Sequence, residues 1–190
     1  MAVKISVRYA AICSLYLLLF SVNTVMGQSH EEAIPIGKSL TTQINCSKRA
    51  GGIEVYDATI TLLRVIRGRE AWDLLKKADA ANKEPDPGKE YILARIGFNM
   101  VARGAPGDKT FDLDRPFQFT ALSGDFEEYE SPKVVLPEPP LKRTVAANQY
   151  AEGWVALEVN KQDDKPLMMF DPSSGGAWSR GKISFFRLYK

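Results

Sequence analysis

The stretch EYILARIGFNMVA, residues 90–102, carries the clearest structural signal in the chain. Apolar side chains recur there at every second position: Ile92, Ala94, Ile96, Phe98 and Met100. The intervening positions hold Tyr91, Arg95 and Asn99, with Leu93 as an apolar exception. A period of two over this length predicts a β-strand with one buried face and one mostly solvated face.

Further strands are predicted on both sides of this stretch. They cover residues 53–66, 117–122, 151–159, 166–170 and 182–189. Residues 70–80 change to helical spacing, with apolar residues at Ala71, Leu74, Leu75 and Ala78, and predict one short amphipathic helix. Residues 103–115 are predicted as a polar loop, and the four prolines of 132–140 as an extended connection. About seven strands with turn signals at close spacing favour a mainly β, antiparallel sandwich with one inserted helix.

The first 27 residues have the features of a cleavable signal peptide. Lys4 and Arg8 precede an apolar run over 10–22, and Val25 and Gly27 suit cleavage before Gln28. The alternative is an uncleaved anchor helix, although the run is short for a membrane span. We expect a secreted or extracytoplasmic protein with no membrane span after cleavage. Residues 28–50 are interpreted as an N-terminal lead-in and 51–190 as the folded domain.

Composition excludes several functional classes. The 190 residues are 45% hydrophobic and 25% charged, as in an ordinary globular protein. The net charge is +2, but Lys4 and Arg8 belong to the signal segment. Without them basic and acidic residues balance, so no electrostatic feature predicts a nucleic-acid partner.

The residues that usually carry catalysis are scarce. The one histidine, His30, falls in the lead-in, which argues against a Ser-His-Asp or Cys-His nucleophile system. Cys13 leaves with the signal segment, so Cys46 can form no internal disulfide. Cys46 is either a reactive or intermolecular thiol or a half-buried small residue. No glycine-rich phosphate loop is present. We therefore expect no enzyme and no cofactor.

Two groups of residues remain as weak candidate sites. Asp108, Asp112 and Asp114 lie in one loop, where clustered carboxylates suit calcium, and the alternative is a solvated loop. Trp72, Trp154 and Trp178 are candidates for a binding surface, since tryptophan is favoured at interfaces. The alternative for these tryptophans is that they pack the sandwich and seal the helix onto it.

One block of the chain is similar to a known group of domains. The block joins Arg67-Gly68 and the EAW of 70–72 to PDPGKEY at 85–91, which opens the long strand. EGWV at 152–155, KPL at 165–167 and Leu188-Tyr189 follow. Over about 51–190 the chain resembles bacterial exported and lipoprotein-type domains of unknown function with a telokin-like, immunoglobulin-like β-sandwich. Many of these carry a lipid-anchored cysteine at the cleavage point, where this chain has Gly27-Gln28.

The resemblance implies an immunoglobulin-like fold and supplies no catalytic residues. Together with the composition it predicts a non-enzymatic binding or interaction module, whose partner is a protein or an envelope ligand. The alternative is a calcium-dependent site or an enzyme that uses the loop of Asp108, Asp112 and Asp114.

Overall fold

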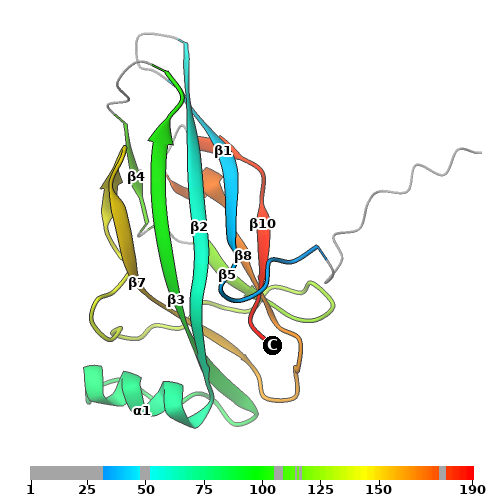
Figure 1. Ribbon diagram of the computed structural model, residues 1–190. Coiled ribbons are helices and arrows are strands. Elements are labelled where there is room, and N and C mark those ends of the chain that lie inside the picture. Colours follow the sequence, from blue (N-terminus) through cyan, green and yellow to red (C-terminus); the bar gives the residue numbers. More distant parts are fainter. Residues whose placement is uncertain (1–31, 48–51, 105–108, 114, 116, 176–178) are drawn as a thin grey trace, which may run out of the picture.

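The computed structural model describes residues 32–47, 52–104, 109–113, 115, 117–175 and 179–190. Residues 1–27, which the sequence predicts as a signal peptide, therefore lie outside the described residues. Within them the chain is mainly β, with ten strands, one α-helix and one short 3-10 helix, Pro172–Gly175 (Figure 1). All strand pairings are antiparallel. The expected mainly β, antiparallel class is confirmed, but the number of strands is ten instead of about seven.

A curled five-stranded sheet forms one layer. Its order is β7 (Tyr150–Asn160), β3 (Lys89–Ala102), β2 (Ile53–Arg67), β1 (Ser39–Ser47) and β9 (Ser179–Gly181). A second sheet has the order β10 (Ser184–Arg187), β8 (Leu167–Phe170) and β5 (Phe119–Leu122), and a small pair joins β4 (Thr110–Asp112) to β6 (Thr144–Ala146). β1, β2 and β3 form an up-and-down meander.

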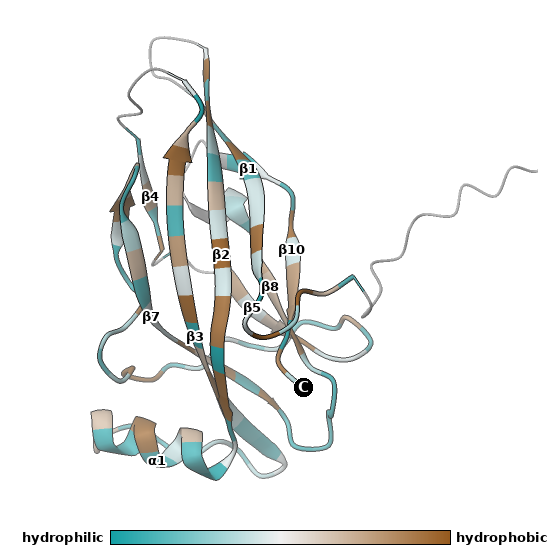
Figure 2. Cartoon of the chain, in the orientation of Figure 1, coloured by the Kyte–Doolittle hydropathy of each residue, from teal (hydrophilic) through white to brown (hydrophobic). Residues whose placement is uncertain are grey.

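The main core lies on the concave side of the five-stranded sheet. Ile92, Ile96 and Phe98 of β3 are fully buried there, as the alternation predicted, and hydrophobic bands alternate with hydrophilic ones along β3 (Figure 2). Phenylalanines from the other sheets complete this core. The ring centroids of Phe98 and Phe111 lie 5.1 Å apart, and those of Phe119 and Phe170 lie 5.2 Å apart. The core therefore joins all three sheets.

The segment interpreted as a lead-in contains a full strand. β1 pairs with β2 along all nine of its residues and with β9 on its other side. Its outward side chains are small and polar, and hydroxyls pair across the strands at Ser39–Thr61 and Thr41–Thr59. Its inward residues include Ile44 and Cys46. The sequence did not predict this strand, because its alternation of apolar residues is short. Pairing with the neighbouring strands determines its conformation.

Three further strands were missed because each has only three residues. β4 lies inside the predicted loop 103–115, and β6 and β9 lie in stretches with no predicted strand. A three-residue strand is too short to show a period of two, so its pairing partner alone defines it.

The predicted helix is confirmed as α1 (Arg69–Ala78), which lies across one end of the main sheet (Figure 1). Ala71, Trp72 and Leu75 are its buried residues. Trp72 packs with Leu93 in a second core cluster on the outer face of the sheet. This cluster explains the apolar exception in β3, because Leu93 lies beneath the helix and not in solvent. Among the described residues, no helix is long and apolar enough to cross a membrane.

Candidate functional site

A groove of about 230 Å³ opens beside β7, an edge strand of the main sheet. Trp154, Val155 and Ala156 of β7 form its floor. We call it the β7-edge groove; its walls come from residues 131–136 and 141–142 and from Leu113, Arg115, Phe117 and Phe119. Most of the described lining residues are apolar, as is usual for ligand sites.

The first wall includes Leu113, Phe117 and Phe119. Phe117 leaves 65% of its surface exposed and has a left-handed backbone, with φ of 62°. That conformation is uncommon for a bulky residue and costs on the order of 1–3 kcal/mol. A strained backbone that holds an aromatic ring at the mouth of a groove is a reason to suspect a ligand site.

The second wall is fastened to the end of α1 by Asn82. The side-chain amide of Asn82 donates to the carbonyl oxygens of Leu75, at 2.7 Å, and Val135, at 2.9 Å. Its Oδ1 accepts from the Val135 N–H at 2.8 Å. Val134 and Leu136 flank Val135, to which Asn82 is bonded. Both line the groove and pack against the second core cluster, which contains Trp72 and Leu93. Tertiary contacts therefore hold the proline-rich connection in place, although it forms no strand of its own.

One end of the groove begins where the chain separates from the edge of β7. Trp154 donates its N–H to the Pro139 carbonyl at 2.9 Å and accepts from the Leu141 N–H at 3.0 Å. This bridge is parallel, and the chain passes so close to Gly153 that a Cβ there would lie 2.4 Å from the Leu141 nitrogen. Beyond Leu141 the chain turns toward β6, and the Arg143 carbonyl accepts from Leu113.

Among the described residues that line the groove, the ionisable side chains are Arg115 and Lys142. The Nε of Arg115 lies 2.9 Å from Oδ2 of Asp112, and about half of the Arg115 side chain is exposed. No described lining residue carries a carboxylate. The groove therefore combines mostly apolar side chains with two basic ones, of which Arg115 is paired with Asp112.

The outer side of Trp154 is covered by a polar network. The guanidinium of Arg95 lies 5.4 Å from the centroid of the indole, and its Nε donates to Glu152 at 2.5 Å. Tyr150 donates its hydroxyl to the same carboxylate at 2.8 Å. The hydrogen bond from Tyr150, followed by the one from Arg95, holds the pKa of Glu152 below its usual range. These contacts hold the indole of Trp154, which is part of the groove floor, in a fixed orientation.

The structure places two of the three candidate tryptophans. Trp72 and Trp154 are only 7% and 6% exposed, and both belong to the helix cluster. This is the arrangement expected if tryptophans seal the helix onto the sheet. Trp154 also lines the groove, so one residue singled out in the sequence does belong to the candidate site. Trp178 lies outside the described residues.

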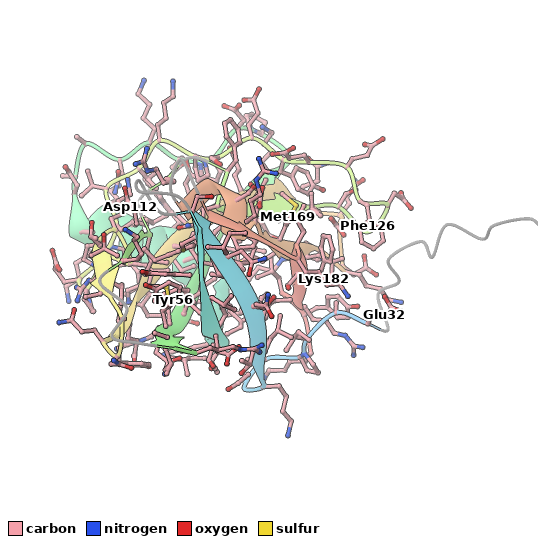
Figure 3. The ribbon with its side chains drawn as sticks, turned by 90° about the horizontal axis from the view of Figure 1, so that it is seen from above. Glu32, Tyr56, Asp112, Phe126, Met169 and Lys182 are labelled. Carbon is pink, nitrogen blue, oxygen red and sulfur yellow. The ribbon has the colours of Figure 1, made fainter. Side chains whose placement is uncertain are left out.

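The structure describes only one of the three candidate aspartates. Asp112 ends β4 on the side of the molecule opposite Phe126 (Figure 3), and its carboxylate pairs with Arg115. Asp108 and Asp114 lie outside the described residues. Within the described part of the chain, no group of three or more His, Cys, Asp or Glu residues could hold a metal ion.

Cys46 is buried in the main core, with 7% of its surface exposed. Burial raises the pKa of its thiol, the nearby Glu54 raises it further, and Lys109 partly opposes the shift. Both the burial and the raised pKa disfavour the thiolate that a reactive cysteine needs. His30 lies outside the described residues.

A larger polar cleft, of about 780 Å³, lies at another part of the molecule. It gathers two acidic pairs that are distant in sequence, Glu127-Glu128 and Asp163-Asp164. The carboxylate of Asp163 accepts from the Tyr129 hydroxyl at 3.0 Å and from the Lys165 N–H at 3.1 Å. These bonds organise the turn between β7 and β8, so Asp163 has a structural role there.

Sequence reasoning missed most of the groove. Phe117 and Phe119 were predicted to lie in one strand, and Val134 and Leu136 in a connection. The one available signal was the run of three apolar residues, Val134-Val135-Leu136, within the proline-rich stretch, which is unusual for a solvated linker.

No protein-family model and no curated protein matches this chain. The structure is similar to a crystal structure described as "a putative lipoprotein (ycdA)" from Bacillus subtilis, with a TM-score of 0.48 and 16% sequence identity. The similarity covers 68% of this chain and 36% of that one, so this chain spans about a third of its length.

Proposed function

We propose that this chain is an exported, non-enzymatic binding module whose β7-edge groove receives an apolar group with a negative charge. Export rests on the signal-peptide pattern of residues 1–27, and a location outside the cytoplasm follows from it. We also propose an immunoglobulin-like sandwich as the fold family, extended by the small β4–β6 pair. The absence of an enzymatic role rests on the scarcity of catalytic residue types in the sequence.

The observation that carries the proposal is Phe117. An exposed phenylalanine on a strained backbone is unfavourable unless the ring has a use, and this ring stands at the mouth of an apolar groove. The two ionisable lining residues, Arg115 and Lys142, are both basic, and Arg115 is paired with Asp112. The calcium-dependent alternative is less favoured, because Arg115 pairs with Asp112.

The test uses 8-anilinonaphthalene-1-sulfonate, an apolar anion whose fluorescence rises when it leaves water. We expect the full chain to bind it and the Phe117→Ala variant to bind it on the order of tenfold more weakly, as for an aromatic anchor. Ile53→Ala is the matched control, since Ile53 is equally exposed but lies at the start of β2. N-phenyl-1-naphthylamine, a neutral analogue, should bind more weakly than the anion.

Circular dichroism of each variant confirms that the fold is retained. Equal affinity of the dye for Phe117→Ala and Ile53→Ala would remove the groove as the binding site. Equal affinity for the anionic and neutral dyes would remove the part of the proposal that concerns charge.

A further inference from the structure

We infer that the partner of the groove is an extended polypeptide segment that adds to the edge of β7 at Ala156. This inference rests on the proposed function, because it names the class of ligand for the same groove. It follows from the direction of the main-chain groups of β7, from the point where the chain leaves that edge, and from the charge of the lining.

The hydrogen bonds of Trp154 reveal which β7 groups face outward. Its N–H and carbonyl bond to Pro139 and Leu141, on the side away from β3. In an antiparallel pair, alternate residues direct their main-chain groups to the same side. Ala156 lies two residues further along β7 and is paired in register with Leu93 of β3. Its N–H and carbonyl therefore also point away from β3, toward the groove.

The chain itself covers this edge only as far as Trp154. After Leu141 it turns away, and within the described part of the chain no backbone hydrogen bond reaches the outward groups of Ala156. An uncovered strand edge is a template for another strand. Here the uncovered position is also the floor of an apolar groove.

The segment 139–141 is an internal example of the ligand we infer. It forms a parallel bridge to β7 and makes two main-chain hydrogen bonds of 2.9 and 3.0 Å to Trp154. A partner strand continuing along the same edge would bond to Ala156 in the same way. Its alternating side chains would point to the two walls of the groove.

The charge of the groove lining indicates which kind of polypeptide segment would bind. Arg115 and Lys142 are the ionisable side chains among the described lining residues, and none of these residues is acidic. Although Arg115 pairs with Asp112, the lining residues themselves carry only positive charge, so complementarity favours a segment with a carboxylate over one with a further cation. A fatty acid would satisfy the charge and the walls but would leave the edge of β7 unpaired.

The probe is an acetylated pentapeptide of alternating valine and threonine that ends in a free carboxylate. Three relatives accompany it: the C-terminal amide, the same peptide with N-methylated backbone nitrogens, and dodecanoate. We expect the first peptide to displace the naphthalene dye from the full chain, and N-methylation to weaken displacement at least about tenfold. Hydrogen exchange followed by NMR should show protection of the Ala156 amide when the peptide is bound.

A substitution in the protein tests the same bonds. Proline at position 156 removes only an N–H that points outward, so Ala156→Pro should fold, as prolines do on edge strands. It should lose affinity for the peptide, and circular dichroism of the variant should show that the fold is retained. Leu157→Pro is the matched control, because its N–H faces β3 and its loss should destabilise the sheet.

Two outcomes would contradict the account, and the experiment distinguishes them. Equal displacement by the methylated and unmethylated peptides, or an unprotected Ala156 amide, would overturn the strand-addition inference. In that case the groove would remain a binding site, with dodecanoate as its better ligand. If neither dye nor peptide binds, the proposed function fails as well. The N-methylated peptide decides the matter even if Ala156→Pro does not fold.

Discussion

At the scale of single residues, Gly153 determines how the edge of β7 is covered. A Cβ at this position would lie 2.4 Å from the Leu141 nitrogen and 2.5 Å from the Pro140 carbonyl carbon, both of them backbone atoms. Backbone cannot move aside as the end of a flexible side chain can. Glycine in a strand otherwise weakens it, so its presence here reflects this close approach of the chain.

Gly153→Ala should therefore lower the free energy of unfolding by about 1–3 kcal/mol, the usual cost of overpacking. The control is Gly104→Ala, because a Cβ at Gly104 would meet nothing within 4 Å and its φ is not positive. Urea denaturation of the two variants measures the difference. Equal stabilities would mean that the 139–141 segment is not held tightly against β7.

At the scale of elements, the clamp of Asn82 links α1 to the groove. One side chain makes three hydrogen bonds, to the last turn of the helix and to both main-chain groups of Val135. In the sequence, Asn82 is only a polar residue just after the helix predicted at residues 70–80. Its role in the clamp depends on a residue 53 positions away, which no local pattern reveals.

Asn82→Ala should release the second wall of the groove. We expect the free energy of unfolding to fall by about 1–2 kcal/mol, since three partly exposed hydrogen bonds are lost. The amide of Val135 should exchange faster with solvent, and the affinity for the naphthalene dye should fall. Asn160→Ala, at an exposed position at the end of β7, serves as the control. Unchanged exchange at Val135 would contradict this role for the clamp.

The sequence predicted long elements well and short ones poorly. β2, β3, β7 and α1 were predicted within one or two residues of their ends, because each spans enough positions to show a period. β1 was taken for a lead-in because its outward face is hydroxyl-rich and its apolar face is short. β4, β6 and β9 form because they pair with strands that are distant in sequence. Their three residues show no alternation that a sequence analysis could detect.

At the scale of the whole molecule, the groove is assembled from four separate stretches of chain. Residues 131–136, 141–142 and 154–156 meet Leu113, Arg115, Phe117 and Phe119 only because three sheets share one core and α1 is fastened to the outer face. The sequence indicated Trp154 as a candidate binding residue in the predicted strand 151–159, but not which segments would surround it. That arrangement depends on tertiary packing between distant segments, and no local pattern in the sequence predicts it.

The central claim is that this groove, and no other surface, takes up apolar anions. The most direct measurement is an NMR titration of the full, ¹⁵N-labelled chain with 8-anilinonaphthalene-1-sulfonate. We predict that the amide shifts will concentrate at Leu113, Lys142, Val155 and Ala156, with little change at Gly124 and Asp164 in the polar cleft. Shifts centred on the polar cleft, or spread evenly over the sheets, would contradict the account.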